Sequence, residues 1–333
     1  MEAEDKGHRY GNFPNYYNFH PPQNRLLILE QCGLMKFIRK GLFGVSDTSE
    51  EVEDNESQST TLPRKKPRID DDNQASVSIT SKSTDAQFES NTINYCDLGC
   101  NAGDLTMSMA SALTKAAGNN EQHNDIKCLG LDIDAELIQR ANNKYSCKNV
   151  DESTDGIVNE VTAPVFQACN LCLSNEHDKA CSDFYATITN AQNSNESIVL
   201  SKPKQIFSLT TIFSTTMWIH IHAGDDGLRE FLERACGWTK KYILIEPQHS
   251  GCYRKANVRL RKMKRPEIDV TEDRLKMRSD IETEIERVVI ACGFRRIRIG
   301  ADAESNGEKG DNLRTAWKRT LQLYERIDAC DGN

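Results

Sequence analysis

The sequence lacks any long hydrophobic run. Among its 333 residues no stretch approaches the ~18 consecutive apolar residues that a membrane-spanning helix needs. The first residues, MEAEDKGHRYGNF, are charged and contain no apolar core, so they do not predict a secretory signal. We therefore expect a cytosolic or nuclear protein that makes no membrane contact. Its twelve scattered cysteines favour free thiols over a disulfide framework.

Acidic and basic residues are unevenly distributed along the chain. Residues 41–90 hold eleven acidic and five basic residues, a net charge of −6 within a total of −8. This polar composition cannot bury enough apolar surface to offset the entropy of ordering, so it predicts a disordered acidic insert. Residues 239–300, by contrast, hold sixteen basic and nine acidic residues, a net charge of +7. The C-terminal region is therefore suited to a polyanionic partner.

Outside the insert, apolar runs alternate with helical patterns, and the sequence contains no internal repeat. The expected strands are 92–98, 126–133, 165–171, 206–213, 241–246, 295–299 and 320–326. The expected helices are 104–117, 135–145, 225–236 and 277–292. The alternation predicts an α/β fold with a doubly wound, mostly parallel sheet and helices on both faces. We divide the chain into an N-terminal arm (1–40), the acidic insert (41–90) and one domain (91–330), with a polar loop at about 174–204.

A glycine-containing turn follows the first expected strand, at the position where such a sheet binds ligands. The segment Asp97-Leu-Gly-Cys-Asn-Ala-Gly103 has the spacing D-x-G-x-x-x-G, which disfavours a dinucleotide pyrophosphate. Taken alone, it is also compatible with an incidental surface turn. Asp132 ends the second strand, where a carboxylate can accept both hydroxyls of a ribose, while Asp134 is placed to cap the next helix. Together with the lack of a P-loop lysine, these features indicate an S-adenosylmethionine site.

Five segments of the chain, in order, carry a family resemblance. They are YGNFPNYYNFHPPQNRL (10–26), DLGCNAGDLT (97–106), LDID (131–134), TTMWIHIHAGDDGL (215–228) and ILIEPQ (243–248). These segments resemble the bicoid-interacting RNA methyltransferases, and the RNA 5′-monophosphate methyltransferase branch more than the methylphosphate capping enzyme. The resemblance implies a Rossmann-like, S-adenosylmethionine-dependent methyltransferase. Its substrate would be the 5′-terminal phosphate of a small structured RNA of the tRNA or microRNA-precursor type.

The resemblance also implies a set of cofactor contacts. Arg25 would pair with the methionine carboxylate, Asn101 would contact it from the turn, and Asp132 would hold the ribose. Asn170-Leu171 stands where relatives have Asp-Phe beside the adenine, and Phe213 stands where they have Met, so these contacts are altered here. The expected cofactor-binding residues are Arg25, Asp97, Gly99, Asn101, Gly103, Asp132, Asn170, Leu171 and Phe213.

The chemistry of a phosphate nucleophile limits what the protein must supply. A phosphate monoester has a second pKa near ~6, so at neutral pH it is mostly a dianion and needs no general base. Catalysis then comes from alignment, and Tyr16 and His220 are the candidates for positioning phosphate oxygens. A structural role for His220 is equally open. His249-Ser250 replaces the Pro-Trp that is usual in the family after EPQ.

A basic run follows this segment. Residues 252–265 (CYRKANVRLRKMKR) contain seven bases and no acid, which favours a track for an RNA backbone over a solvated helix face. The residues expected to contact RNA are Asn12, His20, Thr216, Gln248, Arg254, Lys255, Arg259, Arg261 and Lys262.

Three further expectations concern metal, compartment and assembly. Cys169, Cys172, His177 and Cys181 approach a zinc-knuckle spacing, but the last interval is one residue short, so we expect no metal. The segment 63–68 (PRKKPR) resembles a nuclear import signal, whereas the family branch implies the cytoplasm. We expect a monomer. Two rival functions stay open: γ-phosphate methylation of 5′-triphosphate RNA, and non-catalytic binding of RNA 5′ ends.

Overall fold

The computed structural model describes residues 17, 21–43, 92–114, 125–145, 161–189, 204–262, 264, 266–298 and 319–327. Several predictions fall outside these residues: Asn12, Tyr16 and His20 of the arm, the insert from residue 44 onward, and the basic segment 63–68. The side chains of Arg259 and Lys262 also lie outside the description, although their backbone is helical.

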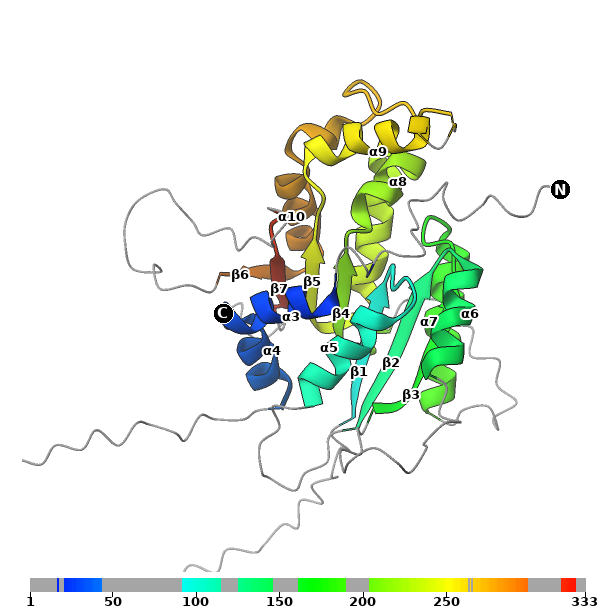
Figure 1. The fold of residues 1–333 in the computed structure, drawn as a ribbon. Coiled ribbons are helices and arrows are strands. Elements are labelled where there is room, and N and C mark those ends of the chain that lie inside the picture. The colour runs from blue at the N-terminus through cyan, green and yellow to red at the C-terminus, as the bar shows by residue number, and fades with distance from the viewer. Residues whose placement is uncertain are drawn as a thin grey trace, which may run out of the picture. The chain divides into compact units, whose positions relative to one another are not determined.

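A seven-stranded sheet forms the centre of the protein, with the strand order β3-β2-β1-β4-β5-β7-β6 (Figure 1). The strands are β1 Ile93–Leu98, β2 Ile126–Asp132, β3 Val161–Ala168, β4 Phe207–Phe213, β5 Thr239–Glu246, β6 Phe294–Ile297 and β7 Gln322–Arg326. Strands β1 to β5 pair in parallel, and β7 runs antiparallel to both β5 and β6. This confirms the doubly wound, mostly parallel fold. The chain order reverses between β1 and β4, which is where such sheets bind ligands.

Helices cover both faces of the sheet. They are α3 Pro22–Gln31, α4 Leu34–Phe43, α5 Asp104–Thr114, α6 Ala135–Tyr145, α7 Ser174–Ile188, α8 Thr216–Trp238, α9 Ser250–Lys262, the 3₁₀ helix η2 Lys276–Asp280 and α10 Ile281–Ala291. One core joins α3, α4 and α5 to strand residues such as Tyr95, Leu209 and Leu244. Another joins α7, α8 and α10 to the alternate strand residues, such as Leu129 and Ile243. Because side chains alternate along a strand, the two cores lie on opposite faces.

The polar segment 174–204 is not a loop throughout, because helix α7 occupies Ser174–Ile188. Its buried side chains, His177, Ala180, Cys181 and Phe184, follow the spacing i, i+3, i+4, i+7 of one helical face. Polar residues between them conceal this narrow stripe in the sequence. The prediction of a loop was therefore wrong for this part of the segment.

Helix α8 begins earlier than predicted, at Thr216 rather than Asp225. Its first turns bury nearly every side chain from Thr216 to Ile221, so they show no amphipathic pattern. Gly224 breaks the helical geometry with φ 74° and ψ −172°, a region that glycine adopts readily. The sequence pattern is therefore regular only after this kink.

Burial of His177 predicts a pH-dependent stability. Burial, with a smaller effect of the Arg234 charge, lowers the pKa of His177 from 6.5 to about 3. Below pH 6.5 the unfolded chain binds a proton at this residue and the folded chain does not. The free energy of unfolding therefore decreases as the pH is lowered. The loss between pH 6.5 and 5 is about 2 kcal/mol. We expect His177→Phe to remove this component in denaturant unfolding at the two pH values. An unchanged pH dependence in the variant would contradict it.

Candidate functional site

The turn after β1 adopts conformations that favour glycine. Gly99 has φ 90° and Gly103 has φ 79°. A Cβ atom on Gly99 would lie 2.0 Å from Thr215 Oγ1, and one on Gly103 would lie 2.6 Å from Phe166 Cζ. Between them, Asn101 also has a positive φ of 53°, and its Oδ1 accepts a hydrogen bond from the Ala102 amide at 2.8 Å. Both glycines are thus needed for the turn and its packing, as the motif predicts.

Asp132 lies at the carboxyl end of β2, beside this turn. Its Oδ2 accepts a hydrogen bond from the Asn101 amide at 2.9 Å, and its Oδ1 accepts one from the Asp134 amide at 3.0 Å. A carboxylate can accept about four hydrogen bonds, so these contacts orient the group and are compatible with ribose hydroxyls as further donors. Asp134 Oδ1 accepts from the amides of Glu136 and Leu137, which confirms it as the cap of α6.

Asp97 lies inside the protein below the glycine turn. It is buried, and its two carboxylate oxygens accept hydrogen bonds from Thr106 Oγ1 at 2.6 Å and Thr211 Oγ1 at 2.8 Å. Burial raises the pKa of Asp97, while these hydroxyl contacts act in the opposite direction. In this structure Asp97 thus ties β1 to α5 and β4 beneath the turn.

Arg25 reaches the same edge of the sheet from α3. It is 1% exposed, and its Nε donates to Glu246 Oε2 at 2.7 Å while its Nη2 donates to Ser214 Oγ at 2.9 Å. The guanidinium carbon lies 5.5 Å from the centre of the Phe213 ring. Because Phe213 and Glu246 are register partners on β4 and β5, both face α3. The structure therefore places Arg25 and Phe213, two of the predicted cofactor contacts, next to each other.

Three residues of this region were missed by the sequence analysis. Arg319, just before β7, contacts Glu246 Oε1 at 3.3 Å and donates to Ser214 Oγ. Tyr17 donates from its hydroxyl to the Cys100 carbonyl of the glycine turn at 3.2 Å. An acid at the end of a strand could have indicated Glu246, as it did Asp132. No local signal marks Arg319.

Thr216 and Gln248, which were predicted to contact RNA, are both buried. Their side chains form hydrogen bonds at the first turn of α8. Gln248 Oε1 accepts hydrogen bonds from Thr216 Oγ1 at 3.1 Å and from the Met217 amide at 3.0 Å. Its Nε2 donates to the Ser214 carbonyl. The exposures are 0% for Thr216 and 2% for Gln248, so in this structure both side chains take part in internal hydrogen bonds.

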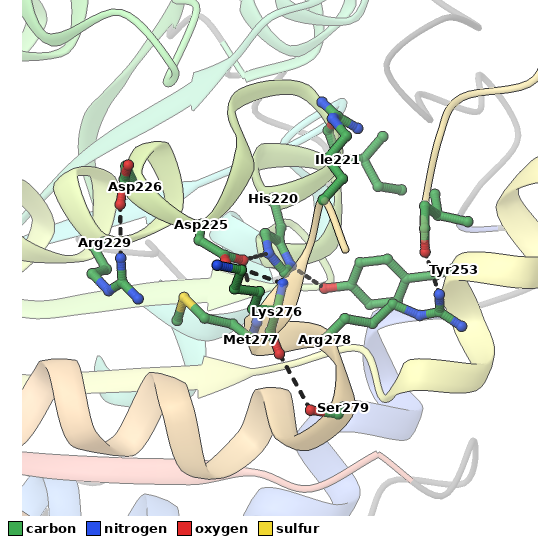
Figure 2. Close-up of polar contacts among 12 residues, drawn as sticks. His220, Ile221, Asp225, Asp226, Arg229, Tyr253, Lys276, Met277, Arg278 and Ser279 are labelled. Carbon is green, nitrogen blue, oxygen red and sulfur yellow. Dashed lines mark hydrogen bonds and ion pairs between the residues drawn. The ribbon is translucent and has the colours of Figure 1, made fainter. Parts of the chain in front are cut away.

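His220 is also an internal residue, with 0% exposure. Figure 2 shows its ring between Asp225 and Tyr253. Its Nε2 lies 2.6 Å from Asp225 Oδ1, and its Nδ1 lies 2.8 Å from Tyr253 Oη. Burial lowers the pKa of His220, although the hydrogen bond with Asp225 raises it. In the neutral ring, Nε2 donates to the carboxylate and Nδ1 accepts from the tyrosine hydroxyl. These contacts fit the structural role that the sequence left open for His220, beside the predicted contact with a phosphate.

Asp225 extends this network to η2. The amides of Lys276 and Met277 donate to its two carboxylate oxygens at 3.1 and 3.2 Å. Burial alone would raise the pKa of Asp225, but the hydrogen bonds from His220 and these amides lower it. His220 and Asp225 therefore join the kinked part of α8 to both α9 and η2.

The basic helix α9 follows β5 and lies above the ends of β4 and β5 in Figure 1. Tyr253, Ala256 and Leu260 are buried, whereas Arg254, Lys255 and Arg261 are exposed. Arg261 Nε pairs with Glu267 Oε1 at 2.7 Å, so one of the predicted RNA contacts has an acidic neighbour from the following segment. Arg254 and Lys255 lie next to Tyr253 and closest to β5.

The residues after β3 lie beside Asp132. The Cys169 amide donates to the Asp132 carbonyl at 2.8 Å, which brings Asn170 and Leu171 to the same edge of the sheet. Asn170 Oδ1 accepts from the Cys172 amide at 3.1 Å, and Leu171 is buried.

In the part of the chain that the structure describes, no three His, Cys, Asp or Glu side chains form a group that could hold a metal. The ten cysteines described there are free thiols.

The family model of Bicoid-interacting protein 3 (Bin3) matches residues 207–326. A pre-miRNA 5′-monophosphate methyltransferase from Xenopus laevis is 28% identical over 320 residues, which cover 95% of this chain and 91% of that protein. An RNA 5′-monophosphate methyltransferase from Rattus norvegicus is 26% identical over 325 residues, 95% of this chain and 82% of that protein. The resemblance to the bicoid-interacting family is confirmed. A solved S-adenosylmethionine-dependent methyltransferase from Methanosarcina mazei is 14% identical, with a TM-score of 0.34, and covers 70% of this chain and 92% of that one.

The Bin3 match divides the candidate site into two parts. It begins at β4 and ends at β7, so it includes Phe213, Glu246, Arg319 and helix α9. The glycine turn and Asp132 precede it, and the longer matches to the 5′-monophosphate methyltransferases cover 95% of this chain. None of the helices among the described residues combines the length and apolarity needed to span a bilayer.

Proposed function

We propose that this protein transfers a methyl group from S-adenosylmethionine to the 5′-monophosphate of a small structured RNA. The observation that carries the proposal is the convergence of Asp132, the glycine turn and Arg25 at the carboxyl edge of β1, β2, β4 and β5. The relatives, whose matches cover 95% of the chain, are named 5′-monophosphate methyltransferases. The proposal takes the RNA 5′-monophosphate from these names. A tRNA or microRNA precursor is the proposed substrate class. We further propose a cytoplasmic monomer.

The described residues fit S-adenosylmethionine. The turn at Gly99 and Gly103 brings backbone close to a ligand, and the carboxylate of Asp132 is held by two amides beside it. Arg25, which pairs with Glu246, lies at the same edge of the sheet, where the family resemblance places the methionine carboxylate of the cofactor. When bound, the cofactor supplies an electrophilic methyl group on a sulfonium.

The protein's own contribution to the reaction is positioning. The phosphate dianion is already a nucleophile at neutral pH. The protein must therefore align a phosphate oxygen with the methyl group and prevent other orientations of the phosphate. Exposed Arg254 and Lys255 lie at the start of α9, where the RNA backbone would approach the edge of the sheet. The scaffold of His220, Asp225 and Tyr253 fixes that helix against α8.

The proposal is tested by radiolabel transfer from methyl-labelled S-adenosylmethionine to three matched hairpin RNAs. The hairpins differ only in their 5′ ends: hydroxyl, monophosphate or triphosphate. We expect label on the monophosphate alone. Label on the triphosphate would instead indicate γ-phosphate capping. No label on any hairpin, with cofactor binding shown by calorimetry, would indicate a non-catalytic RNA-end binder.

Removal of the His220 ring nitrogens distinguishes a positioning role from a direct one. We expect His220→Phe to lower the free energy of unfolding by about 1–3 kcal/mol, because Asp225 and Tyr253 each lose a buried partner. The KM for RNA should rise, while kcat and its pH profile stay close to wild type. The measurements are denaturant unfolding and the pH dependence of methyl transfer. A loss of a titrating step from the pH profile of a folded variant would show direct catalysis instead.

A further inference from the structure

The loop between β3 and α7 (residues 169–173) is tied to its neighbours at its first residues. The Cys169 amide donates to the Asp132 carbonyl at the end of β2, at 2.8 Å. The next amide, that of Asn170, donates to Glu176 Oε2 in the first turn of α7, also at 2.8 Å. These two hydrogen bonds fix the backbone of Asn170 next to Asp132, the proposed ribose-binding residue.

Most of the hydrogen-bonding groups of Asn170 are used within the protein. Besides the amide, its carbonyl accepts from the Leu173 amide at 2.9 Å, and its Oδ1 accepts from the Cys172 amide at 3.1 Å. Because a backbone amide donates only to an acceptor, the contact with Cys172 determines which way the side-chain amide is turned. Among the described residues, only Nδ2 of Asn170 is left without a hydrogen-bond partner.

This orientation of the side chain is the stable one in the loop. An asparagine that accepts a hydrogen bond from the amide two residues later forms an Asx turn. Turning the side chain over would set Nδ2 against the Cys172 amide, two donors facing each other, and would lose that hydrogen bond. Arg234 Nη2 also donates to the Leu171 carbonyl at 3.1 Å, which holds the middle of the loop. The partly exposed Asn170 side chain therefore offers a donor, not an acceptor, to a ligand.

The loop lies on the side of Asp132 where the base of the cofactor belongs. Strand β3 is the outer neighbour of β2, whereas β1, β4 and β5 lie on the other side of β2. Arg25, the proposed contact of the methionine carboxylate, pairs with Glu246 at the end of β5. The base and the methionine extend from opposite sides of the ribose. With the ribose at Asp132, the base therefore lies toward the loop after β3.

We propose that Asn170 leaves the 6-amino group of the cofactor's adenine unrecognised, so that the protein binds a cofactor without this group almost as tightly. This inference rests on the proposed function, in particular on its cofactor site. The 6-amino group is a hydrogen-bond donor, whereas the ring nitrogens of adenine are acceptors. A site that hydrogen-bonds an N–H group rejects the analogue that lacks it, because its own acceptor is then left unpaired. The Asn170 Nδ2 donor pairs with a ring nitrogen instead, and purine retains these nitrogens.

The test is a ratio of two dissociation constants measured by calorimetry. The ligands are S-adenosylhomocysteine, the demethylated cofactor, and the analogue that carries purine in place of adenine. We expect the wild-type protein to bind the two within about threefold of each other, since no hydrogen bond to Asn170 is lost. Asn170→Asp keeps one oxygen for the Cys172 amide and offers the other to the base. It should prefer the adenine ligand by on the order of 10- to 100-fold, because a carboxylate forms a charge-assisted hydrogen bond with the amine.

A matched control separates this contact from the effect of an added charge. Asn143→Asp makes the same change at an exposed position on α6 and should leave the ratio at its wild-type value. The two ligands also carry the same net charge, so a general electrostatic effect cancels in the ratio.

Two results would overturn the proposal. One is a wild-type preference for the adenine ligand of about 10-fold or more, which needs no variant to be measured. The other is an unchanged ratio in a folded Asn170→Asp. Because the ratio is measured without RNA, this inference can fail while the proposed methylation of RNA holds, and the reverse is equally distinguishable.

Discussion

Replacing Asp132 with alanine is expected to reduce methyl transfer by at least about 100-fold. The carboxylate is the proposed acceptor for both ribose hydroxyls, and each hydrogen bond to a charged group contributes about 1.5–3 kcal/mol. The substitution also removes the acceptor for the amides of Asn101 and Asp134, so it loosens the glycine turn on which the cofactor rests. The direct measurement is the dissociation constant for S-adenosylmethionine by calorimetry, together with the rate of label transfer.

A neighbouring residue supplies the matched control for this prediction. Asp134→Ala removes the cap of α6, where Asp134 Oδ1 accepts two amide hydrogen bonds, and should lower stability by about 1 kcal/mol. It should leave cofactor binding close to wild type. Equal cofactor affinity in Asp132→Ala and the wild-type protein would remove Asp132 from the site.

Glu246→Gln is expected to cause the largest loss of stability. Glu246 is fully buried between Arg25 and Arg319, and the amide would remove the carboxylate charge that lies 2.7 Å from the buried Arg25 Nε. Breaking a buried ion pair by removing one partner costs about 3–5 kcal/mol. For a domain of this size that corresponds to a decrease in Tm of roughly 6–20 °C.

An exposed ion pair provides the comparison for Glu246. Asp226 and Arg229 form a salt bridge of 2.8 Å, but their side chains are 91% and 44% exposed. Asp226→Asn should change the free energy of unfolding by less than about 1 kcal/mol, because solvent screens such pairs. Thermal and denaturant unfolding of both variants measures the contrast. A similarly small effect of the two substitutions would show that the Glu246 carboxylate does not stabilise the Arg25 and Arg319 charges.

Features that depend on neighbouring residues could be predicted from the sequence. Helix α6 begins and ends at the predicted residues, Ala135 and Tyr145, because its cap and apolar stripe lie within one segment. The turn at Gly99 and Gly103 was likewise predictable, since its backbone conformation excludes most other residues. The predictions failed where burial concealed the pattern, as in α7 and the first turns of α8.

The sequence by itself determined the alternation of strands and helices, the glycine turn and the acid that follows β2, because each is a property of a short segment. Only the tertiary structure decided which polar side chains are buried in internal networks. It buried His220 and Gln248 within hydrogen-bond networks and joined Arg25, Glu246 and Arg319 from three distant parts of the chain. The physical reason is that the burial of a charge and its partners depend on strand order and helix packing, which no local spacing records.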